Sequence, residues 1–212
     1  MHVPDATTNA AASLSLIAPL FAHLTENEYE GVRRADAADG LSLPPWPARR
    51  VLQNELLVPG MPFAALPVES LYRPWSTQPG GAYGTARGCY LGDTARHVQA
   101  IYDALDVEVP ARFAAAPDHL SLLLELLALF LDSGNRRAAA DLAADHFGWL
   151  GDYDAALARR AREAGQASAL DDARRTALAE GIAHLRTLVA LAGATVRSVT
   201  ASARAALAAG VP

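Results

Sequence analysis

The sequence predicts an all-α protein: a single-domain, multi-helix bundle packed around one central apolar helix at about residues 118–133. Alanine and leucine dominate the 212 residues, whereas the β-branched residues that favour strands are sparse. Proline and glycine are concentrated between Leu41 and Gly88, which leaves the rest of the chain free to form helices. The apolar half of the composition is ample for one well-buried core.

The N-terminal part is expected to form two helices. Residues 1–9 are polar and are expected to be frayed, and apolar residues then recur at helical spacing between Leu14 and Leu24. Thr25 and Glu28 have the spacing of a capping box, in which each side chain satisfies the other residue's backbone N–H. The second helix should therefore begin at this pair.

A short helical segment around 51–57 is followed by a long loop or hinge at 59–88. Prolines and glycines are too frequent there for a long regular element, and loops of this length are uncommon unless they are functional. Its glycines from Gly80 to Gly88 allow an alternative function, a nucleotide-binding or nucleotide-hydrolysing all-α protein. No lysine follows them, so a surface loop is the favoured interpretation.

The central helix has clear start and stop signals. Pro117 keeps the chain extended, Asp118 is a candidate N-cap, and Gly134 favours termination. Only Ser121 and Glu125 interrupt the leucines between them. A helix that is apolar nearly all round should lie inside a bundle, and it is too short to span a membrane.

The remaining chain is predicted to be helical throughout. A helix is expected from Asp93 to about Leu105, before the central one. After the central helix come further helices at 136–149, at 153–164 and from about 171 to 192. Residues 194–212 are expected to form a separate, weakly amphipathic tail helix.

Enzyme, cofactor and metal signatures are missing from the sequence. It contains no HExxH, GxSxG or GxxxxGK motif, its six histidines lack paired ligand spacing, and Cys89 is the only cysteine. We therefore expect no catalytic residue, no cofactor and no metal ion. The net charge of −5 argues against a nucleic-acid partner and against a transcriptional regulator, and no signal peptide or anchor is visible. The composition suits the cytoplasm.

Four polar residues define a candidate recognition stripe on the central helix. Asp118, Ser121, Glu125 and Asp132 follow one another at spacings of three, four and seven. One interpretation is structural, with Asp118 as the N-cap and Glu125 paired with an arginine of this chain. The other is that the stripe floors a groove for an arginine-bearing peptide, with leucines such as Leu122 receiving its apolar part.

Three further residues complete the candidate peptide-binding site. His119 is either a recognition residue or a helix-start histidine bonded to a loop. Tyr72 and Trp75 are either core anchors of the long loop or the aromatic wall of the site. For Tyr72 the core is favoured, and for Trp75 both interpretations stay open.

These segments resemble the TorD/DmsD/NarJ family of redox-enzyme maturation chaperones. Residues 117–128 are similar to the family's PDHLxLELEFMA motif, although Leu123, Leu126 and Leu127 replace its first glutamate and its Phe-Met pair. Three further matches are Pro67-x-x-Ser70-x-Tyr72, the helix bearing Tyr102, and the segment from Leu142 through His146-Phe147 to Trp149, where the tryptophan comes one residue early. The resemblance extends over about residues 10–192.

The resemblance implies an all-helical, TorD-like cytosolic chaperone that is not an enzyme. Its partners would be the twin-arginine leader peptide and the catalytic subunit of a molybdopterin oxidoreductase, bound before export or assembly. The peptide-binding residues would then be Tyr72, Trp75, Asp118, His119, Ser121, Leu122 and Glu125. We expect no stable membrane insertion, and either a monomer or a dimer that exchanges helices across the 59–88 hinge.

Overall fold

The computed structural model describes residues 6–36, 40–78, 80 and 85–208. Within these ranges eight α-helices and three short 3₁₀ helices make up the regular structure, and no β-strand is present. The all-α prediction is therefore confirmed. The outer parts of the predicted N-terminal extension (1–5), of the tail (209–212) and of the glycine loop (Gly81 and Gly84 among them) lie outside the described residues.

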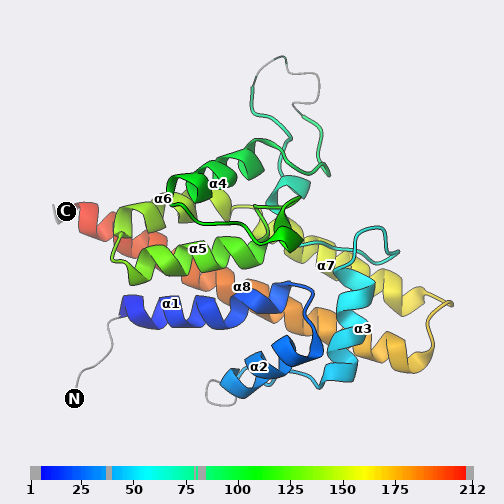
Figure 1. The fold of residues 1–212 in the computed structure, drawn as a ribbon. Helices are drawn as coiled ribbons and strands as arrows, with labels where there is room; N and C mark the ends of the chain where they lie inside the picture. Colours follow the sequence, from blue (N-terminus) through cyan, green and yellow to red (C-terminus); the bar gives the residue numbers. More distant parts are fainter. Residues whose placement is uncertain (1–5, 37–39, 79, 81–84, 209–212) are drawn as a thin grey trace.

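The longest connections between consecutive α-helices are those from α3 to α4 and from α4 to α5 (Figure 1). The α-helices are α1 Ala6–Ile17, α2 Glu26–Asp36, α3 Trp46–Leu56, α4 Asp93–Ala104, α5 Leu120–Asp132, α6 Arg136–His146, α7 Leu150–Gln166 and α8 Asp172–Ala208. The 3₁₀ helices are η1 Ala18–Phe21, η2 Glu69–Leu71 and η3 Ala111–Phe113.

Helix α5 is the predicted central helix. It lies between α1 on one side and α6 on the other, and ten of its 13 residues are buried (Figure 1). Gly134 follows it with a φ of 73°, a left-handed conformation that glycine adopts without strain and that commonly ends helices. Burial on nearly all sides explains why this helix tolerates so few polar residues.

Helix α8 is a continuous element of 37 residues, whereas the sequence predicted a break near residue 193 and a separate tail helix. Gly193 lies within the helix, and the hydroxyls of Thr195 and Thr200 donate to the carbonyls of Leu191 and Val196, one turn earlier. Tertiary contacts with α6 and α7 hold this weakly amphipathic stretch in line, which local spacing could not reveal.

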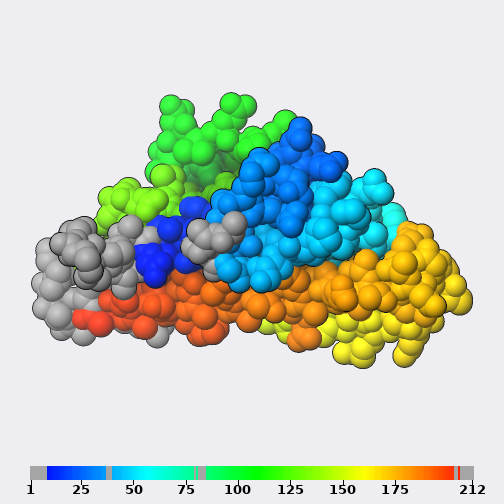
Figure 2. All heavy atoms as spheres, turned by 90° about the horizontal axis from the view of Figure 1, so that it is seen from below, coloured from blue at the N-terminus to red at the C-terminus, as the bar shows by residue number. Residues whose placement is uncertain are grey.

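Along its length α8 packs against α1, α3, α6 and α7 and forms one long face of the molecule (Figure 2). By length and composition, its segment Asp172–Ser202 could cross a membrane. The most apolar window of that segment is nevertheless 44% buried inside the protein, as is usual for a helix that belongs to a core.

The starts of α2 and α5 show one prediction confirmed and one wrong. Thr25 and Glu28 form the reciprocal capping box, with Thr25 N donating to Glu28 Oε2 at 2.7 Å and Glu28 N donating to Thr25 Oγ1 at 3.3 Å. Asp118, by contrast, does not cap α5. His119 is the N-cap, and its Nδ1 accepts from Ser121 N at 3.2 Å.

Candidate functional site

The segments around Ser70 and Asp118, 48 residues apart in sequence, are bonded directly to each other. Asp118 Oδ2 accepts from Ser70 N at 2.6 Å, and the carbonyl of Asp118 accepts from Glu69 N at 3.2 Å. Leu120 N donates to Pro67 O at 2.8 Å, so the loop docks onto the first turn of α5. The side chain of Asp118 is turned towards the loop because the residue lies in a turn before the helix and not on it.

A chain of polar side chains continues from this junction to α6 and α4. Glu69, which is fully buried, accepts from His146 Nδ1 at 2.8 Å through Oε2. The other ring nitrogen of His146 lies 2.9 Å from Nδ1 of the exposed His97. Arg73 Nε is 3.5 Å from Glu69 Oε1. The carboxylate of Glu69 thus connects the long loop directly to α6, and through His146 to α4.

The two buried carboxyls are electrostatically unfavourable when both are ionised. Burial raises the pKa of Glu69, and the charge of Asp118 adds to that rise, while the hydrogen bond to His146 opposes it. Burial also raises the pKa of Asp118, against the lowering effect of the bond from Ser70 N. Such a network holds segments together, and both carboxyl groups are buried, with Glu69 Oε1 and Asp118 Oδ1 lacking a hydrogen-bond partner in the described residues.

The aromatic residues of the long loop serve packing. The ring of Tyr72 stacks on Trp149 with centroids 5.2 Å apart, and its hydroxyl donates to Leu66 O. Trp75 Nε1 donates to Tyr90 O, and the guanidinium of Arg96 lies 5.1 Å above the Trp75 ring. Tyr72 thus joins the core, and Trp75 holds the returning loop beside α4.

An apolar cavity of about 520 Å³ opens next to the start of α5. Its wall combines the loop after α3, the turn around η3 and the N-cap of α5. The lining residues are His23, Leu57, Pro59, Leu66, Val68, Tyr90, Arg112, Phe113, Ala115, Ala116 and His119. A hollow that is mainly apolar with a few polar groups is the usual form of a binding site in proteins.

His119 is the only predicted site residue among those that line this cavity. Its ring lies 4.8 Å from that of Phe113, centroid to centroid, and burial together with the charge of Arg112 lowers the pKa of His119 to about 3. The imidazole is therefore neutral at physiological pH. It caps the helix through Nδ1 and presents an uncharged ring to the cavity.

Charged side chains border the cavity on one side. Arg112 lines it and forms an exposed ion pair with Glu28, Nη1 to Oε1 at 3.0 Å. Glu125 is exposed on α5 and interacts electrostatically with Arg112, and within the described chain it forms no ion pair. Glu28 and Glu125 therefore both interact with Arg112, which is the one of the three that lines the cavity.

The structure separates the seven predicted peptide-binding residues into two groups. Asp118, Ser121 and Leu122 are almost fully buried, and Tyr72 packs on the core. Glu125 is exposed, and His119, Trp75 and Tyr72 are partly exposed. The predicted stripe is thus not continuous, because its first two members face protein and its last two, Glu125 and Asp132, face solvent.

Sequence reasoning missed most of the cavity wall. Phe113 and Tyr90 stand in segments without helical periodicity, so spacing could not assign them to a face. Leu66 and Val68 lie in the long loop, where no regular spacing distinguishes wall residues from other apolar residues. One available signal was the single phenylalanine in the otherwise small and polar segment before Pro117.

Residues 54–146 match the family model described as nitrate reductase delta subunit. This segment contains η2, α4, η3, α5 and α6. It therefore includes Ser70 and Asp118, which form the buried junction, and most of the residues that line the cavity. The match confirms the resemblance that the motifs predicted. No curated protein and no solved structure matched the chain.

Proposed function

Because the chain shares its central segment with the NarJ/TorD-type family of maturation chaperones, we propose that it binds the twin-arginine leader, the apo form, or both, of a molybdopterin oxidoreductase subunit. The family supports a general chaperone role and not a catalytic one. In this proposal the chain acts in the cytoplasm and releases its partner for export or assembly. The partner is a molybdoenzyme catalytic subunit.

The observation that carries the proposal is the apolar cavity beside His119. A twin-arginine leader combines positive charge with an adjoining hydrophobic stretch. Leu57, Leu66, Val68 and Phe113 offer an apolar surface for that stretch, and the neutral ring of His119 adds no charge to it. The cavity is large enough for several aliphatic side chains but not for a folded domain.

The neighbouring charges suit the arginines of such a leader. The Arg112–Glu28 pair is half exposed, with 51% and 44% of the two side chains accessible, so it contributes little stability. An incoming guanidinium can therefore take Glu28 or Glu125 as its partner at small cost, while Arg112 turns towards solvent. Bidentate pairing with a carboxylate would favour arginine over lysine in the leader.

Isothermal titration calorimetry with a synthetic twin-arginine leader tests this site. Ala115 is exposed and lines the cavity, whereas the adjacent Ala114 is exposed and does not. Ala115→Leu should weaken leader binding by about tenfold or more because the added side chain fills the cavity, and Ala114→Leu is the matched control. A leader with both arginines replaced by lysine should also bind less tightly.

Equal affinities of the two variants would exclude the cavity as the binding site. A folded wild-type protein that binds none of the twin-arginine leaders tested would contradict leader recognition itself.

A further inference from the structure

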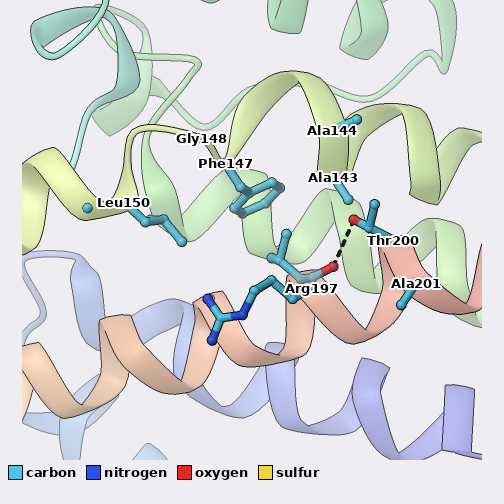
Figure 3. A pocket seen from close by; sticks show the side chains of 11 residues that line it. Ala143, Ala144, Phe147, Gly148, Leu150, Arg197, Thr200 and Ala201 are labelled. Atoms are coloured by element: carbon cyan, nitrogen blue, oxygen red, sulfur yellow. Dashed lines mark hydrogen bonds between the residues drawn. The ribbon is translucent and has the colours of Figure 1, made fainter.

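A second surface feature, a groove, runs along α8 on the side of α6 and α7. It consists of two adjoining hollows of about 500 and 630 Å³, which share Leu150, Gly151, Gly193 and Arg197 in their walls. Figure 3 shows the first hollow, with Phe147 and Leu150 facing Arg197 and Thr200 across it. None of its lining residues belongs to the cavity beside His119.

The shape of the groove suits an α-helix. It follows α8 from Ala183 to Ala201, which at 1.5 Å per residue is roughly 27 Å, or five helical turns. Gly151 lines it without a side chain, and a Cβ placed there would meet no atom within 4 Å, whereas Gly193 is buried beneath Arg197. A partner backbone can therefore approach closely at Gly151, and the exposed side chains of Ala144 and Ala190 offer small apolar contacts.

The positive charge of Arg197 in the groove favours a ligand that carries a carboxylate. Arg186 is neutralised by Asp154, with Nε to Oδ1 at 2.7 Å and Nη2 to Oδ2 at 3.0 Å. Arg197 has no ion-pair partner in the described part of the chain. Its Nη1 lies only 3.3 Å from the position of a Cβ on Gly193, so the guanidinium lies over the glycine, in the wall that the two hollows share.

We propose that this groove binds an amphipathic α-helix of a partner protein, with small and apolar residues facing α8 and one carboxylate near its middle paired with Arg197. Contacts with the exposed alanines of the groove supply the affinity, and the carboxylate sets the register. This surface is independent of the leader site, so one chaperone can hold a leader and a helical segment of a partner at the same time.

A labelled peptide of about 18 residues, which matches the groove length at 1.5 Å per residue, provides the probe for fluorescence anisotropy. Its apolar face carries leucine and alanine with a single central glutamate, and a second peptide has lysine at that position. Gly151→Leu should weaken binding of the glutamate peptide about tenfold or more because leucine fills the groove. Gly165→Leu is the matched control, since Gly165 lies exposed on the same helix with equally open space.

The variant Arg197→Gln separates charge from shape. It should reduce the preference for the glutamate peptide over the lysine peptide to near unity, while circular dichroism and leader binding stay as in the wild type. Equal binding by the Gly151→Leu and Gly165→Leu variants overturns the proposal. So does a wild-type dimer, detected by light scattering, that Gly151→Leu converts to a monomer, because a second copy would then be the occupant.

Discussion

The buried junction at Asp118 and the open cavity beside His119 lie next to each other, yet they are built differently. The junction contains Ser70, Asp118 and His146 of the recognisable motifs, which are hydrogen-bonded to distant segments of the chain. The cavity wall is mostly apolar and comes largely from residues outside those motifs. His119 belongs to both, since it caps α5 and faces the cavity.

This difference shows that the residues of a sequence motif can hold segments of the chain together without contacting a ligand. Ser70, Asp118 and His146 bring the loop after α3, the start of α5 and the end of α6 together. Their positions define where the cavity opens, although their side chains do not line it. Substitutions in the two regions should therefore have opposite signatures, large effects on stability in the junction and mainly effects on binding in the wall.

The largest expected effect is on stability, from Asp118→Ala. The change leaves the buried N–H of Ser70 without its acceptor, and the free energy of unfolding should fall by about 2–3 kcal/mol in urea denaturation. Asp118→Asn retains a side-chain oxygen as acceptor and should recover part of the loss. Asp103→Ala, on the exposed side of α4, should change stability by no more than about 0.5 kcal/mol. Equal losses at positions 118 and 103 would contradict the structural role of the junction.

An intermediate effect is expected from His119→Asn, and it depends on pH. The pKa of His119 is lowered from 6.5 to about 3 in the folded state, so the unfolded chain takes up a proton first as the pH falls. The wild type therefore loses stability below pH 6.5, by about 2 kcal/mol at pH 5, at 1.4 kcal/mol per pH unit.

Asparagine at position 119 can still cap α5 but does not titrate. The unfolding free energy of His119→Asn should thus fall less than that of the wild type between pH 7.5 and pH 5. Parallel pH profiles would show that His119 does not carry this dependence.

The smallest effect on stability is expected from Glu125→Gln. Glu125 is exposed, and desolvation by its neighbours raises its pKa, so neutralising it should change the free energy of unfolding by less than about 0.5 kcal/mol. Leader affinity should nevertheless fall about two- to fivefold, because the variant loses one exposed ion pair with an arginine of the leader. Glu180→Gln on α8 is the control, and an equal loss of affinity in both variants would remove Glu125 from the site.

The predictions that were confirmed depended on local chemistry. The capping box of Thr25 and Glu28, the apolar run of α5 and the stop at Gly134 each require only neighbours in sequence. The predictions that were wrong depended on distant neighbours. Asp118 caps nothing on α5 because Ser70 is near enough to take its carboxylate, and α8 continues past Gly193 because α6 and α7 support it.

By itself, the sequence determined the helical class, the buried character of α5 and the family motifs, because helix periodicity, capping and spacing are local properties. The tertiary structure alone decided which polar side chains turn inward and which surfaces stay hollow. Asp118 and Glu125 are both carboxylates of the same motif, yet one is enclosed by a loop from 48 residues away and the other faces solvent. Burial is a property of long-range packing, and no local pattern contains it.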